Sequence, residues 1–143
     1  MSFEDRCMNK DFDSILRERF GKDSLMSIAT VDSSGIPWVR TVDAIYADGA
    51  FYTITNNLTN KMKHISVNPV VAICGEWFSG HGKAENIGYI RNEENKDLAD
   101  KLRTAFAEWY GNGHTNENDV NTIILKIIVT DGIIYKNGNR FEW

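Results

Sequence analysis

The spacing of hydrophobic residues divides the chain into a short helix followed by strands. Apolar residues recur near the start at the three- and four-residue spacing of one helix face: Phe12, Ile15, Leu16 and Phe20. The pattern stops at Gly21, a residue type that suits a helix end. The period then changes to that of a β-strand over residues 24–32, 38–46 and 50–55, which are separated by turn sequences. We therefore expect one helix followed by a three-stranded meander.

The rest of the chain combines two helices with further strands. Residues 59–66 predict a short helix with Thr59 as its N-cap, and Asn68-Pro69 ends it. The longest helix is expected to start at Asn92 and to carry one apolar stripe as far as Trp109. Strands are expected at residues 70–78, 81–90 and 122–131, with a turn at Ser79-Gly80 and a hairpin-like end at residues 132–143. Because the strands do not alternate with long helices, the order predicts a mainly β fold, an antiparallel closed or nearly closed barrel with helical covers.

The chain has the size and composition of one ordinary globular domain, residues 1–143. With 42% hydrophobic and 25% charged residues it can bury a conventional core. No apolar run reaches the roughly 20 residues that a membrane helix needs, so we expect no membrane association. The net charge of -4 and the lack of basic runs argue against nucleic acid as a partner. The acidic residues near the N-terminus do not resemble an export signal, which predicts a cytoplasmic protein.

Neither the cysteines nor the histidines are spaced as metal ligands. Cys7 and Cys74 form no CxxC motif and show no ligand spacing with the three histidines. We interpret both cysteines as reduced thiols and expect Cys74 to lie in a core strand. No metal site is predicted.

The segment from Arg40 to Lys61 carries groups that suit a phosphate. Arg40 supplies a planar, forked donor and Lys61 a point charge. Thr55 and Thr59 add hydroxyl groups, and the helix expected to start near residue 59 offers free backbone N–H groups. In the two-residue alternation of its strand, Arg40 projects from a row that is otherwise apolar. Because the connections between these elements are short, the groups can converge on one ligand.

Each of these residues also has a structural explanation when it is taken alone. Arg40 could serve a salt bridge, Lys61 a solvated helix face and Thr59 a helix cap. The combination of a strand arginine, a strand-end threonine and a helix start with Thr-Asn-Lys favours a ligand over these alternatives. The chain contains neither GxGxxG nor GxxxxGK[ST], so the two common nucleotide fingerprints are absent.

An ordered set of sequence pieces resembles one known family. The pieces are ATVDSSGIPWVR, GAFYTIT, TNKMKHISVNPVVAI and GKAENI, which lie within residues 24–130. They resemble the pyridoxamine 5'-phosphate oxidase-like FMN-binding split barrels, especially their short general-stress-protein type. The most specific element is a strand with the pattern F-x-T followed by S/T-x-K-x-x-x-I and then N-P, which here runs from Phe51 to Pro69.

The resemblance implies a six-stranded antiparallel split barrel that forms a homodimer, with FMN held at the subunit interface. It places the family's cofactor-binding residues at nine positions of this chain: Arg40, Thr41, Val42, Ile54, Thr55, Thr59, Asn60, Lys61 and Trp77. Thr59 keeps the hydroxyl of the family's serine, whereas Asn60 stands where the family has an arginine, a charge that Lys63 could replace. The register at Trp77 depends on a loop that is shorter here.

Two departures argue against the oxidase reaction that gives the family its name. Ile45 stands where the oxidase carries a lysine, and residues 132–143 lack its arginine and histidine for the pyridoxal substrate. We therefore predict an FMN-dependent oxidoreductase that transfers hydride or electrons between the flavin and an unidentified small molecule, with no catalytic side chain assigned. The alternatives are a non-catalytic flavin-binding or stress-related sensor module, a barrel that binds haem or a deazaflavin, and a barrel that has lost its ligand.

Imidazole and aromatic side chains are further candidates to line the flavin ring or a substrate pocket. His81 is more simply an exposed histidine, and Trp77 and Trp143 more simply pack in the core or at a dimer interface. His64, three residues after Lys61 on the same helix, is expected at the surface.

Overall fold

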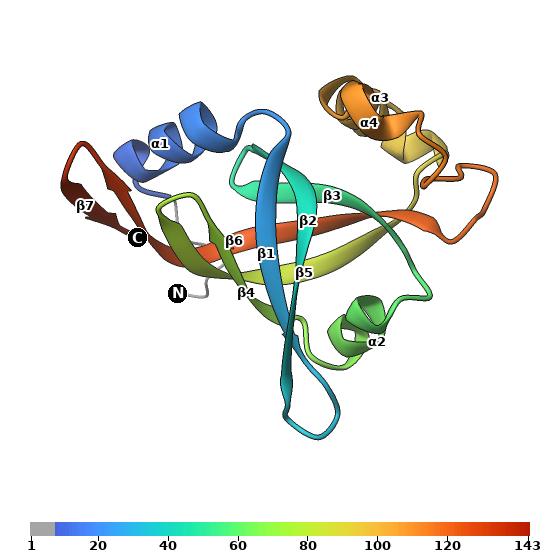
Figure 1. The fold of residues 1–143 in the computed structure, drawn as a ribbon, viewed down its shortest axis with the longest axis horizontal. Coiled ribbons are helices and arrows are strands. Elements are labelled where there is room, and N and C mark those ends of the chain that lie inside the picture. The colour runs from blue at the N-terminus through green and yellow to red at the C-terminus, as the bar shows by residue number, and fades with distance from the viewer. Residues whose placement is uncertain (1–7) are drawn as a thin grey trace.

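A computed structural model, which describes residues 8–143, shows six antiparallel strands that close into a barrel (Figure 1). The strands are β1 (Ser24–Val31), β2 (Pro37–Ala47), β3 (Ala50–Asn56), β4 (Val70–Gly75), β5 (Phe78–Tyr89) and β6 (Thr122–Lys136). They pair in the order β3-β2-β1-β4-β5-β6, and a β3–β6 pairing closes the barrel. A short strand, β7 (Asn139–Glu142), extends β6 as a hairpin. The mainly β, six-stranded antiparallel barrel predicted from the sequence is confirmed.

Helix α1 (Lys10–Phe20) extends the core of the barrel. Its N-cap, Asn9, accepts hydrogen bonds from the backbone N–H groups of Asp11 and Phe12. The apolar face of α1 is buried, and the rings of Phe12 and Phe20 lie 6.2 and 5.8 Å from the ring of Phe78 on β5. Helix α2 (Asn60–Val67) adds two more apolar side chains to the same core. None of the helices in the described part of the chain is long and apolar enough to cross a membrane.

A second core lies on the outside of the barrel, beneath the helices that follow β5. These are η2 (Glu93–Asn95), α3 (Lys96–Ala105) and α4 (Ala107–Tyr110). Leu102 and Phe106 are fully buried against Ile45 of β2 and its neighbours. The sequence predicted one continuous helix from residue 92 to residue 109, but the backbone leaves helical geometry at Phe106. The break keeps Phe106 buried and turns Trp109 so that its ring N–H donates to Asp23 at 2.9 Å.

Two strand boundaries differ from the sequence prediction. The turn between β4 and β5 lies at Glu76 and Trp77, and Gly80 is inside β5. A Cβ atom on Gly80 would lie 2.4 Å from the backbone oxygen of Asp131, so this glycine permits the close approach of β5 and β6. In addition, β6 continues without a break to Lys136, and its last residues, 133–136, pair with β7 in the hairpin expected at the end of the chain.

The cysteine prediction is corrected in part. Cys74 is a free cysteine on β4, but its side chain is on the exposed face of the strand, opposite the buried Val71 and Ile73. Cys7 lies outside the described residues.

The barrel is split between β2 and β3, which diverge sharply in Figure 1. In the described register they pair only through residues 45–47 of β2. Thr53 Oγ1 then donates to the backbone oxygen of Asp43 at 2.7 Å, which holds the strands together just beyond the last backbone pair. Past this bridge, residues 40–42 of β2 and residues 54–55 of β3 lie on opposite sides of the split, and α2 follows β3 directly.

Candidate functional site

Arg40 of β2 and Lys61 of α2 lie close to each other at the split. Burial and, secondly, the nearby charge of Arg40 lower the pKa of Lys61. Lys61 is only 8% exposed, although it is a lysine. No carboxylate among residues 8–143 forms an ion pair with either cation. The pair therefore leaves a local excess of positive charge within a chain whose net charge is -4.

One side of the Arg40 guanidinium is fixed by the protein. Its Nη1 atom donates to Thr30 Oγ1 at 2.7 Å and to the backbone oxygens of Ile28 and Trp38, both at 3.2 Å. Nε and Nη2 make no hydrogen bond with any residue of the described range. Because Nε and Nη2 form one edge of the guanidinium fork, they remain free to bind two oxygens of an anion.

The first turn of α2 adds backbone donors next to Lys61. Thr59 occupies the N-cap position, as predicted, but its side chain makes no capping hydrogen bond. Its hydroxyl instead donates back to the backbone oxygen of Asn56 at 2.9 Å. The first turn contains no acidic residue. Free N–H groups and a positive helix end therefore lie beside two cations, an arrangement that can hold a phosphate.

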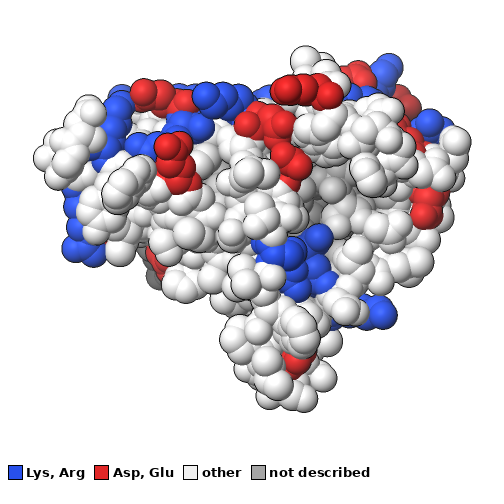
Figure 2. Space-filling model, in the orientation of Figure 1, with Lys and Arg blue, Asp and Glu red and all other residues white. Residues whose placement is uncertain are grey.

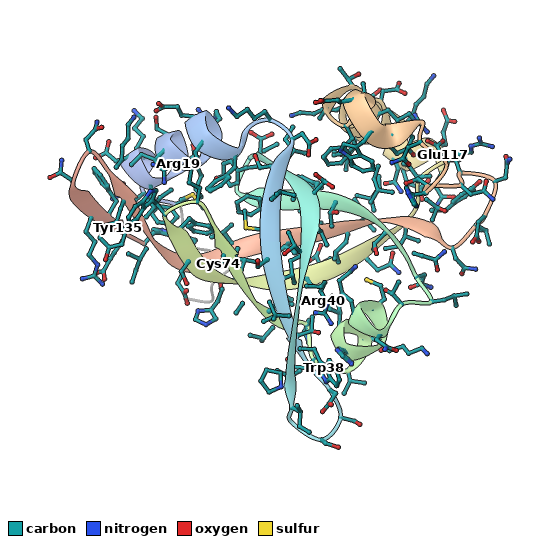
Figure 3. The ribbon with its side chains drawn as sticks, viewed as in Figure 1. Arg19, Trp38, Arg40, Cys74, Glu117 and Tyr135 are labelled. Carbon is teal, nitrogen blue, oxygen red and sulfur yellow. The ribbon has the colours of Figure 1, made fainter. Side chains whose placement is uncertain are left out.

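Residues at the end of β3 line a cavity on the same side of the barrel. The cavity measures about 280 Å³ and lies between Ile54 and Thr55 on one side and residues 114–116 on the other. In Figure 2 a blue patch occupies the position at which Figure 3 labels Arg40, between β2 and α2. The surface between this patch and the helices α3 and α4 is visibly hollowed. The split therefore offers room for a group larger than a phosphate.

The structure does not bring every predicted residue to this cluster. Asn60 is exposed in the first turn of α2, Thr41 is exposed on the outer face of β2, and Val42 packs against the barrel core. Trp77 lies in the β4–β5 turn, is 70% exposed and contacts the ring of Tyr135 at 6.3 Å. Figure 3 shows Tyr135 far from Arg40, at the other end of the molecule. Trp77 is thus remote from the Arg40–Lys61 pair of its own chain.

Lys63 was considered as a replacement for the charge missing at Asn60, and Ile45 stands where the oxidase carries a lysine. The structure places these two residues in different surroundings. Lys63 is exposed on α2. Ile45 is 5% exposed and belongs to the second core, beneath α3. An apolar residue is required there by packing, which explains why this position carries no lysine.

Sequence reasoning missed a contact at the cluster. His64 was expected at the surface, but it is half-buried and its Nδ1 atom lies 2.8 Å from Thr30 Oγ1. The three-residue spacing between Lys61 and His64 was a weak indication that His64 lies near the cluster. Nothing in the sequence indicated Thr30, because it lies on β1, far from Lys61 along the chain. His81 is exposed, as expected, and its Nδ1 atom lies 2.8 Å from Asp131 Oδ1. Among the described residues no three His, Cys, Asp or Glu side chains gather as metal ligands.

The sequence is similar to pyridoxamine 5'-phosphate oxidases over most of its length. A profile described as pyridoxamine 5'-phosphate oxidase matches residues 12–134. The pyridoxine/pyridoxamine 5'-phosphate oxidase of Bdellovibrio bacteriovorus is 35% identical over 101 residues, covering 60% of this chain and 52% of that protein. The chain therefore spans about half the length of the curated relative that it matches.

Solved structures share the fold at low sequence identity. General Stress Protein 26 from Bacillus anthracis str. Sterne has a TM-score of 0.67 and 17% identity, covering 92% of this chain and 98% of that one. A FAD-binding protein from Mesorhizobium loti has a TM-score of 0.66 and 13% identity, covering 89% of this chain and 94% of that one. At these identities the likeness extends to the fold alone.

Proposed function

Since this chain belongs to the pyridoxamine 5'-phosphate oxidase family, we propose that it is a flavoprotein that binds FMN at the split between β2 and β3. The observation that carries the proposal is the Arg40–Lys61 pair. Two neighbouring cations, one of them nearly buried, have no counter-ion among the described residues. Such an arrangement costs free energy unless an anion binds to it. A phosphate would accept from the open edge of Arg40 and from Lys61 at once.

The surroundings of the pair favour a terminal phosphate that belongs to a larger ligand. The free N–H groups at the start of α2 close one end of the site. From there, the strand edges at Thr41, Val42 and Ile54 lead along the split, and the cavity beside Thr55 extends it. FMN has this form, since its phosphate ends a chain attached to a flat ring. Because Asn60 is uncharged, the phosphate contacts here comprise two cations rather than three.

We also propose a homodimer that forms through the outer face of β2, β1 and β4. Val39, Ala29 and Ala72 lie side by side across these strands on the outer face. Leu25, Val39 and Val70 are 68%, 71% and 58% exposed. Figure 2 shows this face as a largely white, uncharged surface. An exposed apolar face of this extent suits a second copy of the chain, and Trp77 would then reach the cofactor site of the partner.

The function that follows is that of an oxidoreductase acting on a small molecule. Bound flavin supplies hydride or electron transfer, and the protein supplies binding, orientation and the shape of the adjacent pocket. We assign no catalytic side chain to this chain. This is consistent with chemistry that the cofactor performs.

The absorption spectrum of the purified protein tests the proposal directly. We expect a two-band flavin spectrum, or its appearance after FMN is added, with weaker uptake of riboflavin and FAD. A protein that takes up no flavin contradicts the proposal, and a Soret band would point to haem instead. Anaerobic addition of NADH or NADPH then tests turnover, because bleaching supports the oxidoreductase and an unchanged spectrum supports a binding module.

Removing both cations tests the site assignment. The double variant Arg40→Ala with Lys61→Ala should weaken FMN binding by about 3 to 6 kcal/mol, since each charge-assisted hydrogen bond contributes about 1.5 to 3 kcal/mol. Riboflavin binding should change little, because riboflavin lacks the phosphate. Titration of flavin fluorescence measures both affinities. An unchanged affinity for FMN would rule out this site.

A further inference from the structure

A hydrogen-bonded chain runs from Arg40 through Thr30 to His64 and joins three elements of the site. Arg40 lies on β2, Thr30 on β1 and His64 on α2, one turn after Lys61. We propose that Thr30 and His64 are positioning residues, which orient Arg40 and α2 so that both cations bind the same phosphate. This inference rests on the proposed FMN site and adds two residues to it.

Chemistry fixes the donor in the first of the two hydrogen bonds of this chain. The guanidinium of Arg40 has no acceptor, so Nη1 donates and Thr30 Oγ1 accepts, at 2.7 Å. The Thr30 hydroxyl lies 2.8 Å from His64 Nδ1, and the imidazole tautomer sets which of the two groups donates. Thr30 is the link through which β2 and α2 are held in one arrangement.

The burial of Thr30 indicates that its hydroxyl group is present for the hydrogen bonds that it makes. Thr30 is 0% exposed, and the residues that share its inward row on β1, Met26 and Ile28, are apolar and equally buried. A valine would fill the same space without the cost of burying a hydroxyl. The hydroxyl adds hydrogen-bond contacts to Arg40 and His64. Its bond with Arg40 is the shortest that the guanidinium makes. Holding Nη1 in this way points the Nε–Nη2 edge toward the ligand.

The consequence for binding is specific to the phosphate. FMN and riboflavin differ only in the phosphate group, so the ratio of their dissociation constants isolates the contacts that Arg40 and Lys61 make. A residue that only stabilises the fold changes both constants together, whereas a residue that positions Arg40 changes the ratio.

The test compares five variants with the wild-type protein by flavin fluorescence titration. Thr30→Val should reduce the preference for FMN over riboflavin about tenfold, as expected for one lost hydrogen bond to a charged group. His64→Leu should reduce it about threefold, because it removes only the hydrogen bond to the Thr30 hydroxyl. Thr30→Ser keeps the hydroxyl, and His64→Asn keeps a hydrogen-bonding amide group near the place of Nδ1, so both should retain the preference. Thr53→Val is the matched control, because it removes another buried hydroxyl that is bonded to Asp43 and not to Arg40.

The outcomes separate this inference from the proposed function. If Thr30→Val and His64→Leu keep the wild-type ratio while the Arg40→Ala, Lys61→Ala double variant loses it, the positioning role is wrong and the FMN site stands. A wild-type protein that binds FMN no more tightly than riboflavin overturns both. If Thr30→Val fails to fold, the positioning role is tested by comparing His64→Leu with His64→Asn. Equal ratios of the FMN and riboflavin dissociation constants in these two variants contradict the positioning role.

Discussion

Lys61 occupies a position that lowers the stability of the ligand-free fold. Its side chain is almost fully buried, its pKa is lowered by burial and by Arg40, and no described carboxylate compensates its charge. A buried cation without a counter-ion destabilises the ligand-free fold. The same feature makes the site attractive to an anion. Stability and binding are thus opposed at this position.

Replacing Lys61 by a neutral side chain of similar length should separate these two effects. Lys61→Met should raise the free energy of unfolding of the flavin-free protein by about 1 to 2 kcal/mol, because it removes the uncompensated charge. The same variant should bind FMN more weakly. Urea unfolding measures the first effect and flavin titration the second.

Lys63 provides the matched control on the same helix. It is exposed, so Lys63→Met should leave both quantities close to those of the wild-type protein. A Lys61→Met variant that is less stable than wild type would show that Lys61 has a stabilising partner.

Among the structural elements, the loop between α4 and β6 is fixed more firmly than its polar sequence suggests. Glu117 accepts hydrogen bonds from Arg103 Nε and Nη2, both at 2.8 Å, and from Arg91 Nε at 3.3 Å. The Tyr110 hydroxyl donates to the same carboxylate. These bonds, those from Arg103 above all, lower the pKa of Glu117 to about 2. Figure 3 shows Glu117 beside α3 and α4, where it ties the loop to both.

The lowered pKa of Glu117 makes a signed prediction about acid stability. The folded state holds the ionised carboxylate, so this contribution is complete above the ordinary value of 4.5 and is lost as pH falls toward about 2. Glu117→Gln should cost on the order of 2 kcal/mol at pH 7, and the difference from wild type should shrink between pH 4.5 and pH 2. Urea unfolding across this pH range measures it. A difference that stays constant with pH would show that Glu117 acts through packing and not through its charge.

The whole molecule leaves one broad sheet face without a covering element. α1 and α2 pack into the first core and α3 and α4 form the second, whereas the outer surface of β2, β1 and β4 has no helix over it among the described residues. The other end of the molecule holds Trp77, which the resemblance assigns to the cofactor. A second copy seated on this face would explain both the exposed apolar residues and the distance of Trp77 from Arg40.

A charge placed on this face should therefore disrupt the dimer. Val39→Glu places a carboxylate at the β2 end of the apolar row, and we expect it to convert a dimer into a monomer in sedimentation equilibrium and to lower the flavin content. Val120→Glu is the control, because Val120 is 65% exposed in the loop after α4, away from the face. A wild-type protein that sediments as a monomer would contradict the homodimer.

The local part of the fold was readable from the sequence because it depends on neighbouring residues. The spacing of Phe12 and Phe20 identified α1, and the alternation around Arg40 identified an inward row on β2. The errors arose where distant packing decides. Gly80 was assigned to a turn because its role depends on β6, and the helix break at Phe106 depends on the second core.

The sequence alone determined the approximate positions of the strands, the barrel class, the family and the residues of the cation pair, since each follows from periodicity or from an ordered motif. Only the tertiary structure decided that Lys61 is buried without a counter-ion, that Nη1 of Arg40 is fixed while its other edge is free, and that Thr30 and His64 join the site. The physical reason is that burial and hydrogen bonding at this site are set by β1, β2 and α2 together. Contacts between elements far apart in the chain leave no local pattern from which they can be read.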